Sequence, residues 1–95
     1  MPVVLTSRER TRLKALAHHL EPIVRVGRAG LSDAFIAEID RALTDHELIK
    51  VRLDSDDREE RLALADEIRA RTEAAPVQRV GKVLVLWRPK PDDEE

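Results

Sequence analysis

Apolar residues recur at two different spacings along this chain of 95 residues, and the two spacings alternate. Spacings of three and four residues mark one face of a helix, whereas short runs rich in β-branched residues mark strands. Three helical patterns and four strand patterns follow one another in the order α-β-α-β-α-β-β. This order predicts a compact single α/β domain with one four-stranded mixed sheet and three helices.

Each predicted helix begins with a residue that can cap its free backbone N–H groups. Thr6 and Glu9 form a capping-box pattern, Ser32 precedes the second helix, and Asp57 with Glu60 forms a second capping-box pattern. The residues predicted to face the core are Leu13, Leu16, Ala17 and Leu20 in the first helix, Phe35, Ile36, Ile39, Ala42 and Leu43 in the second, and Leu64, Ala65 and Ile68 in the third.

The strands are predicted at 23–26, 48–53, 77–80 and 83–88. Pro22 and Pro76 are expected to stop the first and third helices, because a residue before proline avoids the helical conformation. Gly81-Lys82 is typical of a two-residue type II′ hairpin turn between the last two strands. The run 83–86 is apolar on both faces, which predicts that its strand lies inside the sheet.

The length predicts a single domain at 1–89 with a thin core, followed by an acidic tail at 90–95 that we expect to be disordered. Cysteine is absent, so disulfides and thiol chemistry are excluded. No apolar stretch has the ~20 residues of a membrane span, and the start of the chain does not resemble a signal peptide. We therefore expect a soluble, cytoplasmic monomer.

The net charge of −2 conceals an asymmetry. Residues 1–30 carry six Lys or Arg and two Asp or Glu, whereas residues 31–81 carry eight against thirteen. A basic first third on an otherwise acidic protein favours a polyanionic partner. The alternative is a solvated helix that is rich in arginine.

The segment Gly27-Arg28-Ala29-Gly30 follows a predicted strand and precedes a predicted helix. Unpaired backbone N–H groups and the positive end of the helix dipole meet there, and KH-type modules grip a nucleic-acid backbone with such a GxxG loop. A plain tight turn is the alternative. The basic residues that could support RNA binding beside the loop are Arg25, Arg8, Arg12, Lys14 and Lys50, although for Lys50 a solvated strand residue is the favoured interpretation.

Catalysis and metal binding find little support in the sequence. His18 and His19 are adjacent, so on a helix they point about 100° apart and cannot share one metal. Asp54, Asp56 and Asp57 weakly resemble a calcium loop but lack its glycine and distal glutamate. We predict no enzyme activity, no cofactor, no metal and no small-molecule substrate. Trp87 could stack on a base or lie at the edge of the core.

Several segments together resemble a known family. They are Leu13-Lys14-Ala15-Leu16-Ala17-His18, Pro22-Ile23-Val24, Val26-Gly27-Arg28-Ala29-Gly30-Leu31, Glu38-Ile39, Ala42-Leu43, His46-Glu47-Leu48-Ile49-Lys50-Val51, Val80-Gly81-Lys82 and Leu86-Trp87-Arg88-Pro89. In this combination the chain resembles the bacterial YhbY-type proteins, the stand-alone form of the CRM (chloroplast RNA splicing and ribosome maturation) domain.

The resemblance implies a fold similar to the C-terminal domain of translation initiation factor three. It also implies RNA binding through the GxxG loop and the basic first helix, and assistance to precursors of the large ribosomal subunit. The chain departs from the family at Arg28, where Lys is frequent, at Glu73, where Gly often ends the third helix, and in its acidic tail. The alternative function is a protein-interaction module that acts on the assembling ribosomal particle.

Overall fold

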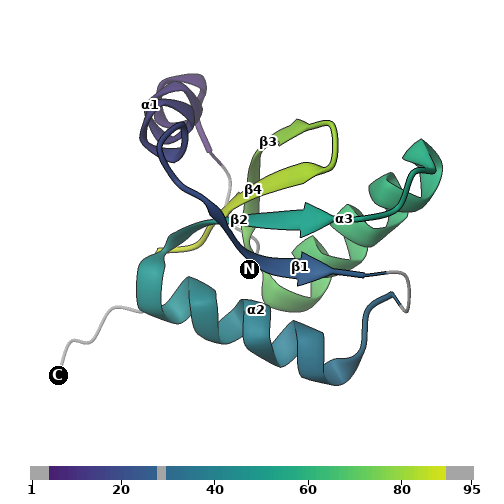
Figure 1. Cartoon of the computed structure of the whole chain (residues 1–95). Coiled ribbons are helices and arrows are strands. Elements are labelled where there is room, and N and C mark those ends of the chain that lie inside the picture. Colours follow the sequence, from purple (N-terminus) through teal and green to yellow (C-terminus); the bar gives the residue numbers. More distant parts are fainter. Residues whose placement is uncertain (1–4, 28–29, 90–95) are drawn as a thin grey trace, which may run out of the picture.

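The computed structural model describes residues 5–27 and 30–89 (Figure 1). Its elements are α1 (Ser7–Ala17), β1 (Pro22–Val26), α2 (Asp33–His46), β2 (Leu48–Leu53), α3 (Arg58–Thr72), β3 (Ala75–Val80) and β4 (Val83–Trp87). The strands lie in the order β1-β2-β4-β3, with β1 parallel to β2 and with β4 antiparallel to both its neighbours. The predicted fold class is confirmed.

The larger core lies between one face of the sheet and the helices α2 and α3 (Figure 1). Residues of β2 alternate as predicted, so that Ile49, Val51 and Leu53 are buried while Lys50 and Arg52 point to the other face. The helices contribute the buried side chains Ile36, Ile39 and Leu43 from α2 and Ala65 and Ile68 from α3, with Phe35, Ala42 and Leu64 partly buried beside them.

A smaller core lies on the opposite face, where α1 packs on β2, β3 and β4. Its buried side chains are Leu13, Ala17, Val77 and Val85, and Trp87 packs half-buried against them. Trp87 thus lies at the edge of a core. Arg10 fastens α1 to the edge strand, because its Nη1 donates hydrogen bonds to the carbonyls of Pro76 at 2.7 Å and Val77 at 3.1 Å.

The predicted end and inner face of the first helix were wrong in part. The helix ends at Ala17 rather than near Pro22, and Leu20 lies in the turn that follows, where its N–H donates to the carbonyl of Ala17. Leu16 and Leu20 remain 52% and 38% exposed. The buried residues of α1 are Leu13 and Ala17, one turn apart on the same side, so this short helix buries a narrower stripe than its sequence pattern predicts.

The predicted end of the third helix was also wrong. The helix ends at Thr72, and Glu73 adopts a left-handed conformation with φ of 60°. Pro76 does not stop the helix but lies within β3, which begins at Ala75. Because β3 is an edge strand, the missing N–H of proline is tolerated there.

The cap of the third helix was right, but its capping box was not. The carboxylate of Asp57 accepts a hydrogen bond from the N–H of Glu59 at 3.0 Å. The carboxylate of Glu60 accepts a hydrogen bond from the hydroxyl of Ser55 instead of reaching back to the Asp57 N–H. The hydroxyl of Ser55 accepts a hydrogen bond from the Asp57 N–H at 3.1 Å. Ser55 therefore makes the contact that Glu60 would make in a capping box.

The interior strand and the hairpin were predicted correctly. In β4, between β2 and β3, Leu84, Val85 and Leu86 are all buried. Gly81 has φ of 57°, the positive value that the first central position of a type II′ turn requires. None of the helices within the described residues is long and apolar enough to cross a membrane. The acidic tail predicted at 90–95 lies outside the described residues.

Candidate nucleic-acid interface

The glycine loop connects β1 to α2, and its two glycines differ. The N–H of Gly30 donates to the carbonyl of Gly27 at 3.1 Å, which closes a tight turn. Gly30 has φ of 81°, where side chains are strained, whereas Gly27 has no positive φ. A Cβ at either position would meet no atom within 4 Å. The backbone therefore requires glycine at Gly30, while the surface at Gly27 is open. The predicted site residues Arg28 and Ala29 lie outside the described residues.

The start of α2 behind the loop is capped by its own side chains. The hydroxyl of Ser32 accepts a hydrogen bond from the N–H of Phe35 at 3.2 Å, as the sequence predicted. Asp33 in the first turn pairs with Arg71 of α3 at 2.7 Å, and this hydrogen bond raises the pKa of the Arg71 guanidinium above its usual value. The Asp33 carboxylate offsets part of the positive helix end. Phosphate binding at the loop therefore needs further cations.

One side of the loop is acidic. Gly27 and Gly30 share a groove of about 410 Å³ with residues 54–57, Glu60 and Leu64. Within residues 5–27 and 30–89, no group of three or more His, Asp or Glu is placed to hold a metal ion. The acidic side repels phosphate, so a polyanion is expected to approach the loop from the side of Arg25.

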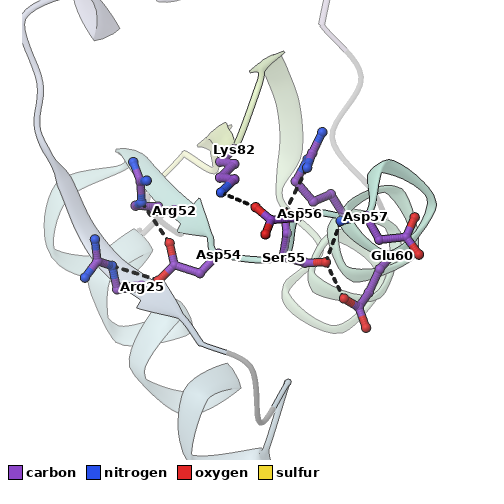
Figure 2. Close-up of polar contacts among 9 residues, drawn as sticks. Arg25, Arg52, Asp54, Ser55, Asp56, Asp57, Glu60 and Lys82 are labelled. Atoms are coloured by element: carbon purple, nitrogen blue, oxygen red, sulfur yellow. Dashed lines mark hydrogen bonds and ion pairs between the residues drawn. The ribbon is translucent and has the colours of Figure 1, made fainter.

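Arg25 lies two residues before the loop, on the sheet face that carries α1, and its side chain is 66% exposed. Its Nε contacts Oδ2 of Asp54 at 3.0 Å, while Nε of Arg52 donates to Oδ1 of the same carboxylate at 2.8 Å. Figure 2 shows both guanidinium groups on the same side of Asp54, away from the contacts that Asp56 and Glu60 make. The loop thus has a basic side as well as an acidic one.

Lys14 and Lys50 come together although they are far apart in sequence. Both line a groove of about 290 Å³ between α1 and the sheet, together with His18, Gln78 and Val80. Neither lysine side chain forms a hydrogen bond or ion pair with a described residue. The structure therefore places these two predicted site residues on one basic surface.

Arg8 and Arg12 are exposed on α1, and their side chains form no ion pair with a described residue. Figure 1 shows α1 near the start of β1, whereas Gly27 directly follows the end of that strand. The strand β1 has five residues and so spans ~17 Å. The site residues predicted from the sequence therefore do not form one continuous cluster. Gly27, Gly30 and Arg25 lie at the loop, whereas Lys14 of α1 lies near Lys50. Arg8 and Arg12 lie on the exposed side of α1.

Arg52 was missing from the candidate residues, although the sequence held a signal for it. In β2 it alternates with the buried Val51 and Leu53, so it lies on the same face as Lys50. The parallel register pairs Arg52 with Arg25 across the two strands. Alternation gives the face of Arg52, but only the strand order makes it a neighbour of the loop.

Comparison with known proteins assigns the chain to a family. Residues 5–88 match the CRS1 / YhbY (CRM) domain. The chain belongs to this family. The match covers every helix and strand described above, so the CRM domain makes up almost the whole chain.

Several relatives of this CRM domain carry names that refer to RNA. The chain is 46% identical over 85 residues to a protein of Haemophilus influenzae named "RNA-binding protein", covering 90% of this chain and 86% of the relative. It is 41% identical over 92 residues to a Pseudomonas aeruginosa protein named "Probable RNA-binding protein", with 95% and 88% covered. The solution structure of a Staphylococcus aureus protein, described as hypothetical and as a candidate RNA binder, is similar with a TM-score of 0.81 and 30% identity, covering 96% of this chain and 95% of that protein.

Proposed function

We propose that this CRM-domain protein binds RNA without catalysing a reaction on it, and grips the RNA backbone with the Gly27–Gly30 loop and the basic face beside it. The observation that carries the proposal is the polarity of the loop's surroundings. A Cβ at either Gly27 or Gly30 would meet no atom within 4 Å, and Arg25 lies on one side of the loop while acidic residues line the other. Relatives named as RNA-binding proteins support RNA as the polyanion.

A non-catalytic role is consistent with the local chemistry of the described residues. Ser32 and Asp57 cap helices, and Ser55 bonds Glu60, so these groups serve the backbone and each other. His18 and His19 stack edge to face with ring centroids 5.3 Å apart, and no carboxylate of the described residues bonds either ring. Such a set lacks the linked nucleophile and base of a hydrolytic site.

We further propose that the protein acts as a cytoplasmic monomer on precursors of the large ribosomal subunit. This part rests on the family resemblance. A tagged copy is expected to sediment with large-subunit precursors in low salt during active growth and to be depleted from finished ribosomes. Sedimentation as free protein under those conditions would contradict the ribosomal role and leave RNA binding itself standing.

RNA binding can be tested by filter retention with a fragment of large-subunit precursor RNA at several salt concentrations. Phosphate contacts release counterions, so the affinity is expected to fall steeply as salt rises. Arg28→Ala removes one cation and should lower the slope of log K against log salt by about one unit, with the circular dichroism spectrum unchanged. Retention of the RNA fragment that is the same with and without the protein would contradict the proposal.

A protein-interaction module is the second candidate. It is favoured by an apolar groove of about 480 Å³ whose lining includes Leu16, Leu20 and Ile23, all substantially exposed. Exposed apolar side chains that gather in one place are typical of protein contact sites. Salt separates the two functions, because binding through an apolar groove does not weaken steeply as salt rises.

A further inference from the structure

Arg25 and Arg52 form a pair that the sheet itself aligns. They are register partners on the parallel strands β1 and β2, so their side chains leave the same face of the sheet next to each other. On the same face, α1 packs on β2, β3 and β4. Two adjacent guanidinium groups repel each other, so an anionic group is needed to hold them together.

Asp54 is that anionic group. It follows β2 directly, and its N–H donates to the carbonyl of Val26 at 3.0 Å, which fixes its backbone against the end of β1. Its two carboxylate oxygens are divided between the arginines, Oδ2 to Arg25 and Oδ1 to Arg52. Asp54 is 26% exposed and Arg52 is 38% exposed, so both are held more firmly than free surface side chains.

The contacts with Asp54 use Nε in both arginines. Neither Arg25 nor Arg52 donates a hydrogen bond from its Nη groups to a described residue. A guanidinium carries five N–H donors in a fixed plane, four of them on the two Nη atoms. Each arginine therefore keeps its Nη donors available while its Nε contacts the Asp54 carboxylate. Two arginines against one carboxylate leave one net positive charge.

We propose that Arg25 and Arg52, held side by side by Asp54, bind one phosphate group of the RNA backbone. The proposal rests on the proposed function and names a second contact beside the glycine loop. Two guanidinium forks presented together match the oxygens of a phosphate, which lysine binds only as a point charge. Arg25 is separated from Gly27 by Val26 alone, so the same RNA strand can reach the loop and the pair. Asp54 is a positioning residue in this arrangement.

The first test compares alanine with lysine at Arg52, using the filter assay and the precursor RNA fragment. Arg52→Ala should lower the salt slope by about one unit, because the one net positive charge of the two arginines and Asp54 is lost. Arg52→Lys keeps the charge and hence the slope, but it should weaken binding severalfold because the fork is gone. Arg41→Ala and Arg41→Lys on α2, exposed and on the other side of the sheet, serve as matched controls and should bind like wild type. Binding of Arg52→Lys equal to wild type would overturn the proposal.

The second test uses the sign of the effect at Asp54. Asp54→Asn makes the protein more positive by one charge, so a mere electrostatic patch would bind RNA more tightly. If Asp54 positions the two arginines, the same variant binds more weakly despite the added charge. A melting temperature measured alongside separates loss of positioning from unfolding. Tighter binding by folded Asp54→Asn would overturn the positioning role.

The third test asks whether the arginines share one phosphate. Arg25→Ala and Arg52→Ala should then be non-additive, and the double variant should lose less affinity than the product of the two single losses. Independent, additive losses would overturn a shared site. Wild-type protein that fails to bind RNA overturns the proposed function, whereas wild-type binding with unaffected Arg25 and Arg52 variants overturns only this inference.

Discussion

Gly30 and Gly27 show how two identical residues in one motif differ in what they require. Gly30 needs glycine for its backbone conformation, whereas Gly27 is glycine without a positive φ and without a close neighbour. Gly30→Ala should lower the free energy of unfolding by about 1–2 kcal/mol, because a Cβ is strained at a left-handed position. Gly27→Ala serves as the control and should leave it unchanged. Urea denaturation measures both, and equal losses would contradict the assignment.

Ile49 tests the register of β2. It is 1% exposed within the larger core, so Ile49→Ala should cost roughly 2–5 kcal/mol of stability. Its neighbour Lys50 points to the other face, and Lys50→Ala should change the stability little. The sequence predicted this alternation correctly, because the period of a strand is local. An unchanged melting temperature for Ile49→Ala would contradict the register.

Glu73 ends α3 in a left-handed conformation that glycine adopts without strain. Glu73→Gly should therefore stabilise the protein by about 0.5–1 kcal/mol, since it removes the strain of the Cβ. Glu38→Gly within α2 is the matched control and should destabilise by about 1 kcal/mol, because its backbone is helical. Thermal unfolding of both variants gives the comparison, and a lower melting temperature for Glu73→Gly would refute this interpretation.

At the scale of the elements, capping residues predicted where helices begin better than prolines predicted where they end. Thr6, Ser32 and Asp57 cap their helices because each bonds an N–H within three residues. Pro22 and Pro76 instead begin or lie within strands. The helix ends depend on sheet contacts and on the edge position of β3, neither of which is local in sequence.

The helix α1 is attached to the sheet through a smaller core than the one beneath α2 and α3. A small core and the two hydrogen bonds from Arg10 to β3 hold this helix. Arg10→Ala should raise amide hydrogen exchange in α1 while the amides of β2 and β4 stay protected. Arg8→Ala, an exposed residue of the same helix with no partner among the described residues, is the control. Equal exchange in both variants would show that Arg10 does not fasten the helix.

At the scale of the whole molecule, the sequence predicted the fold class and the charge asymmetry but not how the charges are arranged. Helix and strand periods are local and give the element order directly. The acidic groove beside the loop and the alignment of Arg25 with Arg52 arise from strand order and register. For this reason Arg52 and Asp54 could be assigned to the site only from the structure, while Arg25 could be proposed from its place before the loop.

If the protein holds RNA at the glycine loop, as we propose, Gly27→Asp should disrupt that contact. The position is open and unstrained, so the carboxylate should leave the fold intact while repelling a phosphate there. The measurement is filter retention of the precursor RNA fragment at low and high salt, with melting temperature as the folding control. Folded Gly27→Asp should bind the RNA much more weakly than wild type at low salt and differ from it less at high salt, since the repulsion is screened. Wild-type affinity of folded Gly27→Asp at both salt concentrations would contradict this proposal.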